Sequence, residues 1–257
     1  MDDTERDATP MPEINIVEFS DLKEILAKGW HDYKQAPIFG IIFGSMFALG
    51  GMVIYLQLMV WGEGWGIFSV IVGFPLISPF LAVGLYEVSR EIERGETPTW
   101  QHVLNGILRE RSREIPWMAF VSVFFFGMWT YLAHLIFALF FGLKPMTNVM
   151  SSNSILFTTD GLVFLVVGTI AGAVIATALF SITVVSIPLL LHREVDFITA
   201  MITSVNFVLN NKMVMFVWGI IVTGLTLIAM LPFFLGLLVI LPVLGHATWH
   251  LYRIAVD

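Results

Sequence analysis

Apolar residues along this chain form long stretches that polar residues seldom interrupt. A helix needs about 20 mostly apolar residues to cross a hydrocarbon core of roughly 30 Å, and six stretches approach or exceed that length. They cover residues 37–60, 65–89, 116–141, 161–191, 213–230 and 232–254. We expect a turn near Pro232, because one helix through both of the last stretches would be about twice as long as the core is thick. The pattern predicts an all-α fold, a polytopic bundle of six transmembrane helices over residues 37–257.

The segment before the first stretch, residues 1–36, is acidic and contains one amphipathic helix. Leu22, Ile25 and Tyr33 recur there at helical spacing, with lysines on the opposite side. Ser20 is the expected amino-terminal cap of this helix. The pattern predicts a cytoplasmic segment whose helix lies on the membrane surface. No short apolar run with a cleavage site follows a basic start, so we expect no removable signal peptide.

Two further amphipathic segments follow the second and fourth stretches. Residues 97–110 have Thr97 or Thr99 as the expected cap, and residues 196–210 have Asp196. Each segment has one apolar face, which predicts a short helix in the membrane interface. We expect these helices to anchor the chain, and a docking surface for a partner is the alternative.

The basic residues predict the orientation of the chain in the membrane. Twelve of the 13 lysines and arginines lie in the terminal segments or in the second and fourth connections, and Lys144 alone lies on the opposite side. The positive-inside rule counts these residues rather than the net charge of −7. Both termini are therefore expected on the cytoplasmic side of the membrane, and the number of crossings should be even. Acidic residues alternate with the basic ones, so we expect no nucleic-acid partner. The expected partners are the lipid bilayer and a membrane complex.

Composition agrees with a membrane location and removes several classes of function. Hydrophobic residues make up 57% of the 257 residues, and the mean hydropathy is +0.85. The chain has no cysteine, which excludes disulfides, thiolate catalysis and cysteine-bound zinc or iron–sulfur clusters. The middles of the six stretches lack Asp, Glu, Lys and Arg, which argues against an ion-coupled transporter. No HExxH motif, glycine-rich phosphate loop or nucleophile–base pair occurs, so we predict no catalytic residues.

Prolines mark a repeat in the second, fourth and sixth stretches. Pro79, Pro188 and Pro242 each stand in an apolar setting, and each helix runs toward the cytoplasmic side. Proline removes a backbone donor and kinks a helix, so the repeat predicts three pseudo-repeated hairpins of one orientation. A chance match of three prolines is the alternative, because proline is common in membrane helices.

Small residues recur at four-residue spacing in the first and fourth stretches. They are Gly40, Gly44 and Ala48, and Gly168, Gly172 and Ala176. This spacing lets helix backbones approach each other closely. We expect packing within the chain, with packing between chains as the alternative.

Three histidines near the cytoplasmic side are the candidate metal ligands. His246 and His250 lie four residues apart, hence on one helix face, and His192 follows its proline at the same offset as His246. Three imidazoles with an open position could hold a metal ion, and Glu87 and Asp196 are expected at similar depth. The simpler interpretation is that these amphipathic side chains lie in the headgroup region.

His134 stands alone in the apolar third stretch and is the one candidate haem ligand. A haem with two histidine ligands needs a second histidine at similar depth, and no other histidine is expected in the outer half of the bundle. A histidine hydrogen-bonded between helices is the favoured interpretation. We therefore predict no cofactor, with a metal ion or haem as alternatives.

Several phrases of the sequence resemble an uncharacterised bacterial family of predicted integral membrane proteins. They are DLKEILAKGWHDYKQAPIFG, LISPFLAVGLYEVSREIERGE, LLLHREVDFITAMITS and LPFFLGLLVILPVLGHATWHLYR. The resemblance implies a multi-pass membrane protein without an established activity. Some members of the family carry a cytochrome c oxidase label, but an oxidase catalytic subunit needs several intramembrane histidines for its haems and copper. Only His134 qualifies here, so the label implies an accessory or assembly role.

Three hypotheses about function follow from these patterns. The leading one is a non-catalytic inner-membrane protein that packs against, or helps to assemble, a larger membrane complex. The resemblance implies that this complex is a respiratory one. The second is a carrier of small molecules or metal ions, whose cytoplasmic mouth contains His192, His246 and His250. The third is a membrane-embedded enzyme at the same histidines, which would require a water-filled cavity.

Overall fold

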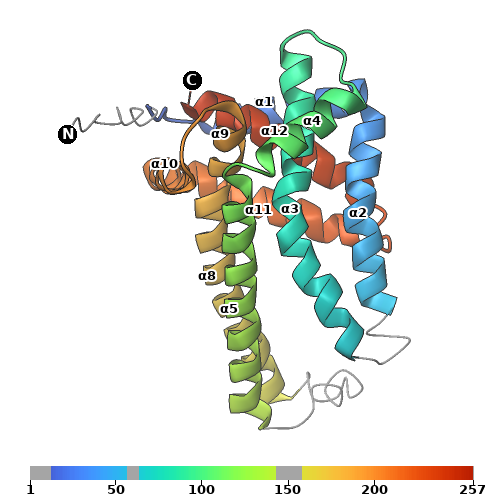
Figure 1. Cartoon of the computed structure of the whole chain (residues 1–257). Helices are drawn as coiled ribbons and strands as arrows, with labels where there is room; N and C mark the ends of the chain where they lie inside the picture. Colours follow the sequence, from blue (N-terminus) through green and yellow to red (C-terminus); the bar gives the residue numbers. More distant parts are fainter. Residues whose placement is uncertain (1–12, 57–63, 143–157, 257) are drawn as a thin grey trace, which may run out of the picture.

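The computed structural model describes residues 13–56, 64–142 and 158–256, and every regular element in these ranges is a helix (Figure 1). The all-α prediction is confirmed for this part of the chain. The amino-terminal half contains α1 (Phe19–Gln35), α2 (Pro37–Leu56), α3 (Gly64–Glu93), α4 (Trp100–Glu110) and α5 (Ile115–Phe141). The carboxyl-terminal half contains α8 (Thr159–Thr183), α9 (Ser186–His192), α10 (Phe197–Asn210), α11 (Lys212–Met230) and α12 (Leu237–Val256).

Within the described ranges, five candidate membrane spans are long and apolar enough to cross a bilayer. They are α2, α5, α8 continued into α9, α11 and α12. The remaining predicted stretch, 65–89, lies in α3, which has 30 residues, but the side chains of 64–76 are outside the described residues. The count of six crossings is therefore still a prediction.

The long apolar run at the carboxyl end is broken by a turn around Pro232. α11 ends at Met230 and α12 begins at Leu237. Phe233 and Phe234 adopt left-handed φ angles of 52° and 65°, which are unfavourable for large side chains. Both rings pack on α2: Phe233 lies edge-on to Tyr55 with ring centroids 5.3 Å apart, and Phe234 covers Gly51. These aromatic contacts hold the turn in place.

The helices run in two directions. α5 and α8 lie side by side along the long dimension of the molecule, whereas the α11–α12 pair runs across them near the end that carries both termini (Figure 1). α12 is the central helix of that end, because it packs against α1, α2, α3, α9 and α11. The elements that contain the repeated prolines Pro79, Pro188 and Pro242, which are α3, α9 and α12, contact one another there.

The small residues of α2 are used for packing within the chain. A Cβ at Gly40 would lie 2.6 Å from the ring of Tyr33, and one at Gly44 would lie 2.9 Å from the backbone of α12. Glycine is therefore required at both positions. In α8, Gly172 faces the ring of Trp129 on α5, whereas nothing lies within 4 Å of a Cβ at Gly168.

The amino-terminal caps of the amphipathic helices match the sequence pattern in two cases of three. Thr99 caps α4 by accepting a hydrogen bond from the backbone N–H of His102, at 3.3 Å, and Asp196 caps α10. The prediction of Ser20 as the cap of α1 is wrong. α1 begins two residues earlier than that cap implies, at Phe19, because the carboxylate of Asp21 accepts the backbone N–H of Glu18 at 2.8 Å, which makes Glu18 the cap residue.

Removal of the Asp196 cap should destabilise α10. Its carboxylate accepts the backbone N–H of Thr199 at 2.9 Å and the Thr199 hydroxyl at 2.6 Å. The hydroxyl, and secondly the backbone N–H, keep the pKa of Asp196 below its usual value. We expect Asp196→Ala to lower the free energy of unfolding by about 1 kcal/mol at neutral pH. Denaturant unfolding in detergent micelles measures this loss.

The same measurement at low pH gives an internal control. A lowered carboxyl pKa contributes stability above the ordinary pKa of aspartate, about 4, and this contribution is lost as the pH falls through the lowered value. The difference between wild type and Asp196→Ala should therefore shrink toward pH 3. A difference that is independent of pH would mean that Asp196 acts without its charge.

Candidate functional site

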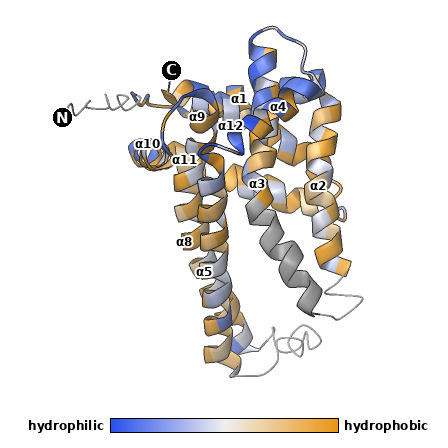
Figure 2. Ribbon diagram, viewed as in Figure 1, coloured by the Kyte–Doolittle hydropathy of each residue, from blue (hydrophilic) through white to orange (hydrophobic). Residues whose placement is uncertain are grey.

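Charged and polar side chains gather at the end of the molecule where both termini lie. Figure 2 shows this end in blue, over the end of α3, over α4 and along the α9–α10 connection, while the shafts of α5 and α8 are mostly apolar. The first and last described segments are joined directly, because the backbone N–H of Asn15 donates to the carbonyl of Ala255 at 3.0 Å. Two groups of polar residues at this end could carry a function.

The first group is a buried hydrogen-bond network between α1, α3 and α12. Asp32 on α1 accepts hydrogen bonds from the Ser89 hydroxyl on α3 and from His250 Nε2 on α12, both at 2.8 Å and both at the same carboxylate oxygen. The Ser89 hydroxyl also lies 2.8 Å from His246 Nδ1. Because the single proton of Ser89 goes to Asp32, His246 Nδ1 must donate to Ser89. We call Asp32, Ser89, His246 and His250 the Asp32 network.

The local sequence explains why these residues meet. Leu22, Ile25, Gly29 and Asp32 form one buried stripe of α1, and Gly29 allows this stripe to lie directly on the backbone of α12. His246 and His250 lie four residues apart on α12 and therefore present both imidazoles toward α1 and α3.

The chemistry of the Asp32 network is structural rather than catalytic. Serine, histidine and aspartate are the residues of a hydrolytic triad, but here the Ser89 hydroxyl donates to the carboxylate instead of to the imidazole. Ser89 and His246 are completely buried, so a substrate carbonyl cannot reach the hydroxyl. The network joins three helices.

The three predicted metal ligands have three different partners. His246 bonds to Ser89 and His250 to Asp32, whereas His192 Nδ1 lies 2.7 Å from the Tyr252 hydroxyl. The structure thus brings His246 and His250 into one network and leaves His192 in a neighbouring contact between α9 and α12. The two acidic residues expected at similar depth are also engaged: Asp196 caps α10, and Glu87 pairs with Arg90 at 3.1 Å.

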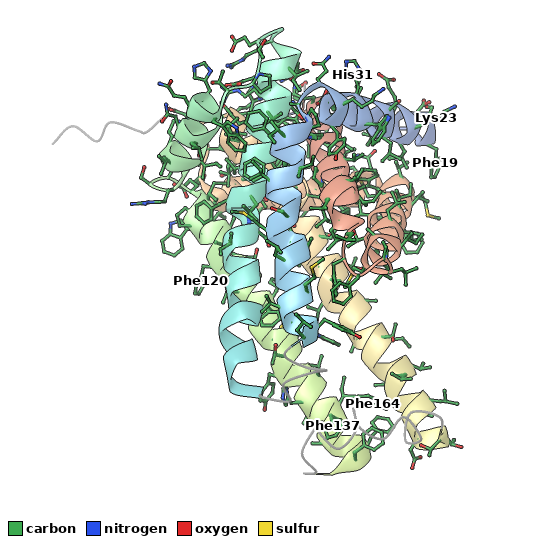
Figure 3. The ribbon with its side chains drawn as sticks, turned by 90° about the vertical axis from the view of Figure 1, so that its right-hand side faces the viewer. Phe19, Lys23, His31, Phe120, Phe137 and Phe164 are labelled. Atoms are coloured by element: carbon green, nitrogen blue, oxygen red, sulfur yellow. The ribbon has the colours of Figure 1, made fainter. Side chains whose placement is uncertain are left out.

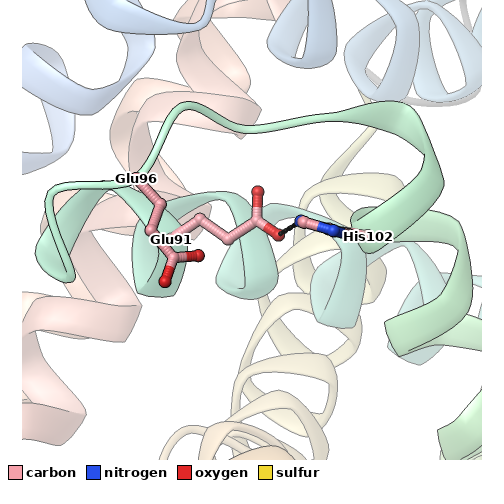
Figure 4. A group of neighbouring side chains, drawn as sticks. All are labelled: Glu91, Glu96 and His102. Carbon is pink, nitrogen blue, oxygen red and sulfur yellow. Dashed lines mark ion pairs between the residues drawn. The ribbon is translucent and has the colours of Figure 1, made fainter.

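The second group lies in an open groove between the end of α3 and α4. Glu91 Oε1 lies 3.1 Å from His102 Nδ1, and Glu96 from the connecting loop faces this pair (Figure 4). The groove has a volume of about 670 Å³ and a polar lining that includes Arg94 and Arg109. Of all histidines and carboxylates that the structure describes, this trio alone has three ligand atoms within 4.8 Å of one another.

The loop between α3 and α4 shapes the second group. Gly95 takes a left-handed φ of 74°, which turns the chain back at the end of α3. The backbone N–H of Thr99, the cap of α4, donates to Glu91 Oε2 at 3.2 Å. The Glu91 side chain is only 4% exposed, whereas that of His102 is 59% exposed. The trio is therefore anchored on one side and open to water on the other.

His134, the candidate haem ligand, lies on the exposed side of α5. Its Nδ1 donates to the backbone carbonyl of Thr130, at 2.7 Å, on its own helix. This bond directs the proton to Nδ1 and leaves Nε2 as the acceptor. This hydrogen bond of His134 lies within α5. Among the described residues, no hydrogen bond from His134 to another helix is found.

Sequence reasoning missed Asp32, Ser89 and the Glu91, Glu96 and His102 trio. Asp32 could have been noticed, because it continues the apolar stripe of α1 at helical spacing, and an acid in that position needs a buried partner. The trio had no such signal, because its members are separated by a loop whose path the pattern does not determine.

Comparison with known proteins gives one match. Residues 67–192 match the model of a family described as "Predicted integral membrane protein (DUF2189)". No curated protein and no solved structure matches the chain. The family match confirms the resemblance to an uncharacterised family of membrane proteins.

Proposed function

We propose that this chain, whose residues 67–192 match the DUF2189 family model, is a non-catalytic subunit or assembly partner of a larger membrane complex. The observation that carries the proposal is a polar and aromatic face of α5 whose residues are exposed in the described part of the chain. We call it the outer face of α5, and it consists of Phe124, Gly127, Tyr131 and His134.

The outer face of α5 is exposed along its length. Phe124 is 58% exposed and Tyr131 74% exposed, and His134 is also exposed. Figure 3 shows the contrast with the opposite side of the helix, where Phe137 packs against Phe164 of α8 while Phe120 projects outward. α5 packs against both α3 and α8, and the four residues of its outer face remain exposed.

Lipid is a poor environment for this face. A buried polar group without a hydrogen-bond partner is costly, and histidine in a membrane span is rarely directed to lipid. His134 Nε2 needs a donor, and Tyr131 carries a hydroxyl one turn away. Gly127 leaves open space, with nothing within 4 Å of a Cβ at that position. A helix of another membrane protein that carries a donor could therefore approach closely and satisfy His134.

The carrier hypothesis has less support. It places a transport mouth at His192, His246 and His250, yet each of these side chains bonds to a packing residue of a neighbouring helix. Opening such a mouth would break the Asp32 network. The respiratory link remains an inference from the resemblance.

Site-specific photo-cross-linking in native membranes tests the proposal. A photoreactive phenylalanine at Tyr131 should form one discrete protein adduct, and His134→Leu should reduce it about tenfold, since a hydrogen bond between membrane helices contributes about 1–2 kcal/mol. The matched control is the same photoreactive residue at Val166, an exposed apolar position of α8.

Two outcomes would contradict this function. If Tyr131 and Val166 give the same pattern, the outer face of α5 contacts lipid only. If His134→Leu leaves the adduct unchanged, the histidine does not contribute to partner binding. Detergent unfolding of His134→Leu controls for folding, and we expect no loss of stability because the side chain is exposed.

A further inference from the structure

We propose that the groove between α3 and α4 binds a divalent metal ion through the carboxylates of Glu91 and Glu96 and the imidazole of His102. This site is separate from the histidines that the sequence pattern selected, and it lies on different elements from the outer face of α5. Its ligands would be one nitrogen and two oxygens. Glu91 lies in the last turn of α3, Glu96 in the connecting loop and His102 in the first turn of α4.

The distances fit a small coordination sphere. Metal–ligand bonds of about 2.0–2.2 Å place neighbouring ligand atoms about 3.0–3.5 Å apart. Glu91 Oε1 and His102 Nδ1 already lie at 3.1 Å, and Glu96 offers an oxygen within 4.8 Å of both. Glu96 is exposed and stands in the loop, so rotation of its side chain would bring its oxygen into the sphere.

The groove is lined by three carboxylates, Glu87, Glu91 and Glu96, and by two arginines, Arg94 and Arg109. The Glu91 carboxylate is nearly buried. Arg90 pairs with Glu87 and Arg109 with Glu110, each at 3.1 Å, so the described ion pairs of these two arginines engage other carboxylates than Glu91 and Glu96. A metal ion between the two carboxylates would remove their mutual repulsion.

The surroundings support the trio as a prepared site. The backbone N–H of Thr99 donates to the second oxygen of Glu91. Carboxylates that bind metal ions are commonly oriented in this way, by a hydrogen bond from a neighbouring group that does not touch the metal. His102 and Glu96 face the open groove, so an ion can enter and keep water as its remaining ligands. One imidazole with two carboxylates suits zinc, manganese or iron(II) better than magnesium or calcium, which prefer oxygen alone.

Binding of this ion would fasten α4 to the end of α3. Glu91 belongs to α3 and His102 to α4, and the connection between them turns at Gly95. An ion bound in the groove would therefore make the polar end of the molecule more rigid.

The test uses the full chain, purified in detergent and stripped with a chelator, with zinc and cobalt ions alone as probes. We expect about one zinc ion per chain by calorimetry and a visible absorption band with cobalt that reports the ligand field. His102→Ala and Glu96→Gln should each weaken binding at least about tenfold and remove or shift the cobalt band. The matched control is His31→Ala, an exposed histidine on α1 bonded to Gln35.

Several results would overturn the metal site. Equal affinity in wild type and His102→Ala, or an equal loss in His31→Ala, would mean that zinc binds elsewhere or without a defined site. Absence of any zinc or cobalt binding by a folded wild-type chain would have the same effect. The variants change the exposed members of the trio, since Glu91 is nearly buried and its replacement could disturb folding.

Discussion

Replacement of Gly29 by alanine should lower the free energy of unfolding by about 3 kcal/mol, near the upper end of the range for overpacked sites. A Cβ at this position would lie 2.6 Å from the carbonyl oxygen of Val243 and 2.7 Å from the backbone nitrogen of Ala247. Both are backbone atoms of α12, the central helix of the polar end, and cannot move aside as a flexible side chain could. α1 must therefore shift away from α12.

The shift should also weaken the Asp32 network, because Asp32 follows Gly29 on the same stripe of α1. Denaturant unfolding in detergent micelles measures the loss of stability, and limited proteolysis at Lys23 and Lys28 reports whether α1 has detached. We expect faster cleavage at these lysines in Gly29→Ala than in wild type.

Gly224→Ala is the matched control for this prediction. Nothing lies within 4 Å of a Cβ at Gly224 on α11, and alanine favours a helix over glycine by about 1 kcal/mol. The control should be neutral or slightly stabilising. Equal stabilities of the two variants would show that α1 does not pack on α12 as closely as described.

Asp32→Ala should destabilise the chain by about 3–5 kcal/mol, because it leaves two donors without their acceptor, and each unsatisfied buried donor costs about 1–3 kcal/mol. The carboxylate is almost fully buried, and its loss leaves the Ser89 hydroxyl and His250 Nε2 without their acceptor. Asp32→Asn should cost less, because the amide oxygen can still accept one hydrogen bond.

A double-mutant cycle with His250→Ala tests whether the effect comes from this pair. We expect a coupling of at least about 1 kcal/mol between Asp32 and His250, because each side chain loses its partner in the single variants. Glu24→Ala is the control on the same helix, since Glu24 is exposed and pairs only with Lys28 at 2.8 Å. It should have no measurable effect, and purely additive losses for Asp32 and His250 would contradict the network.

Hydropathy and periodicity alone determined the class of this protein. The apolar stretches predicted an all-α membrane protein, and the positions of Thr99 and Asp196 predicted where two short helices begin. These features depend on residues close together in the chain: a helix needs an apolar segment of sufficient length and a side chain that satisfies its first N–H groups. Neither requirement involves another helix.

The tertiary structure alone decided which polar groups meet. The spacing of His246 and His250 placed both on one helix face, but the rotation and translation of α12 against α1 and α3 gave them Asp32 and Ser89 as partners and left His192 with Tyr252. The groove trio depends on the path of the loop at Gly95. A sequence pattern describes one helix at a time, whereas hydrogen bonds between helices depend on how close-packed side chains set the helices against one another.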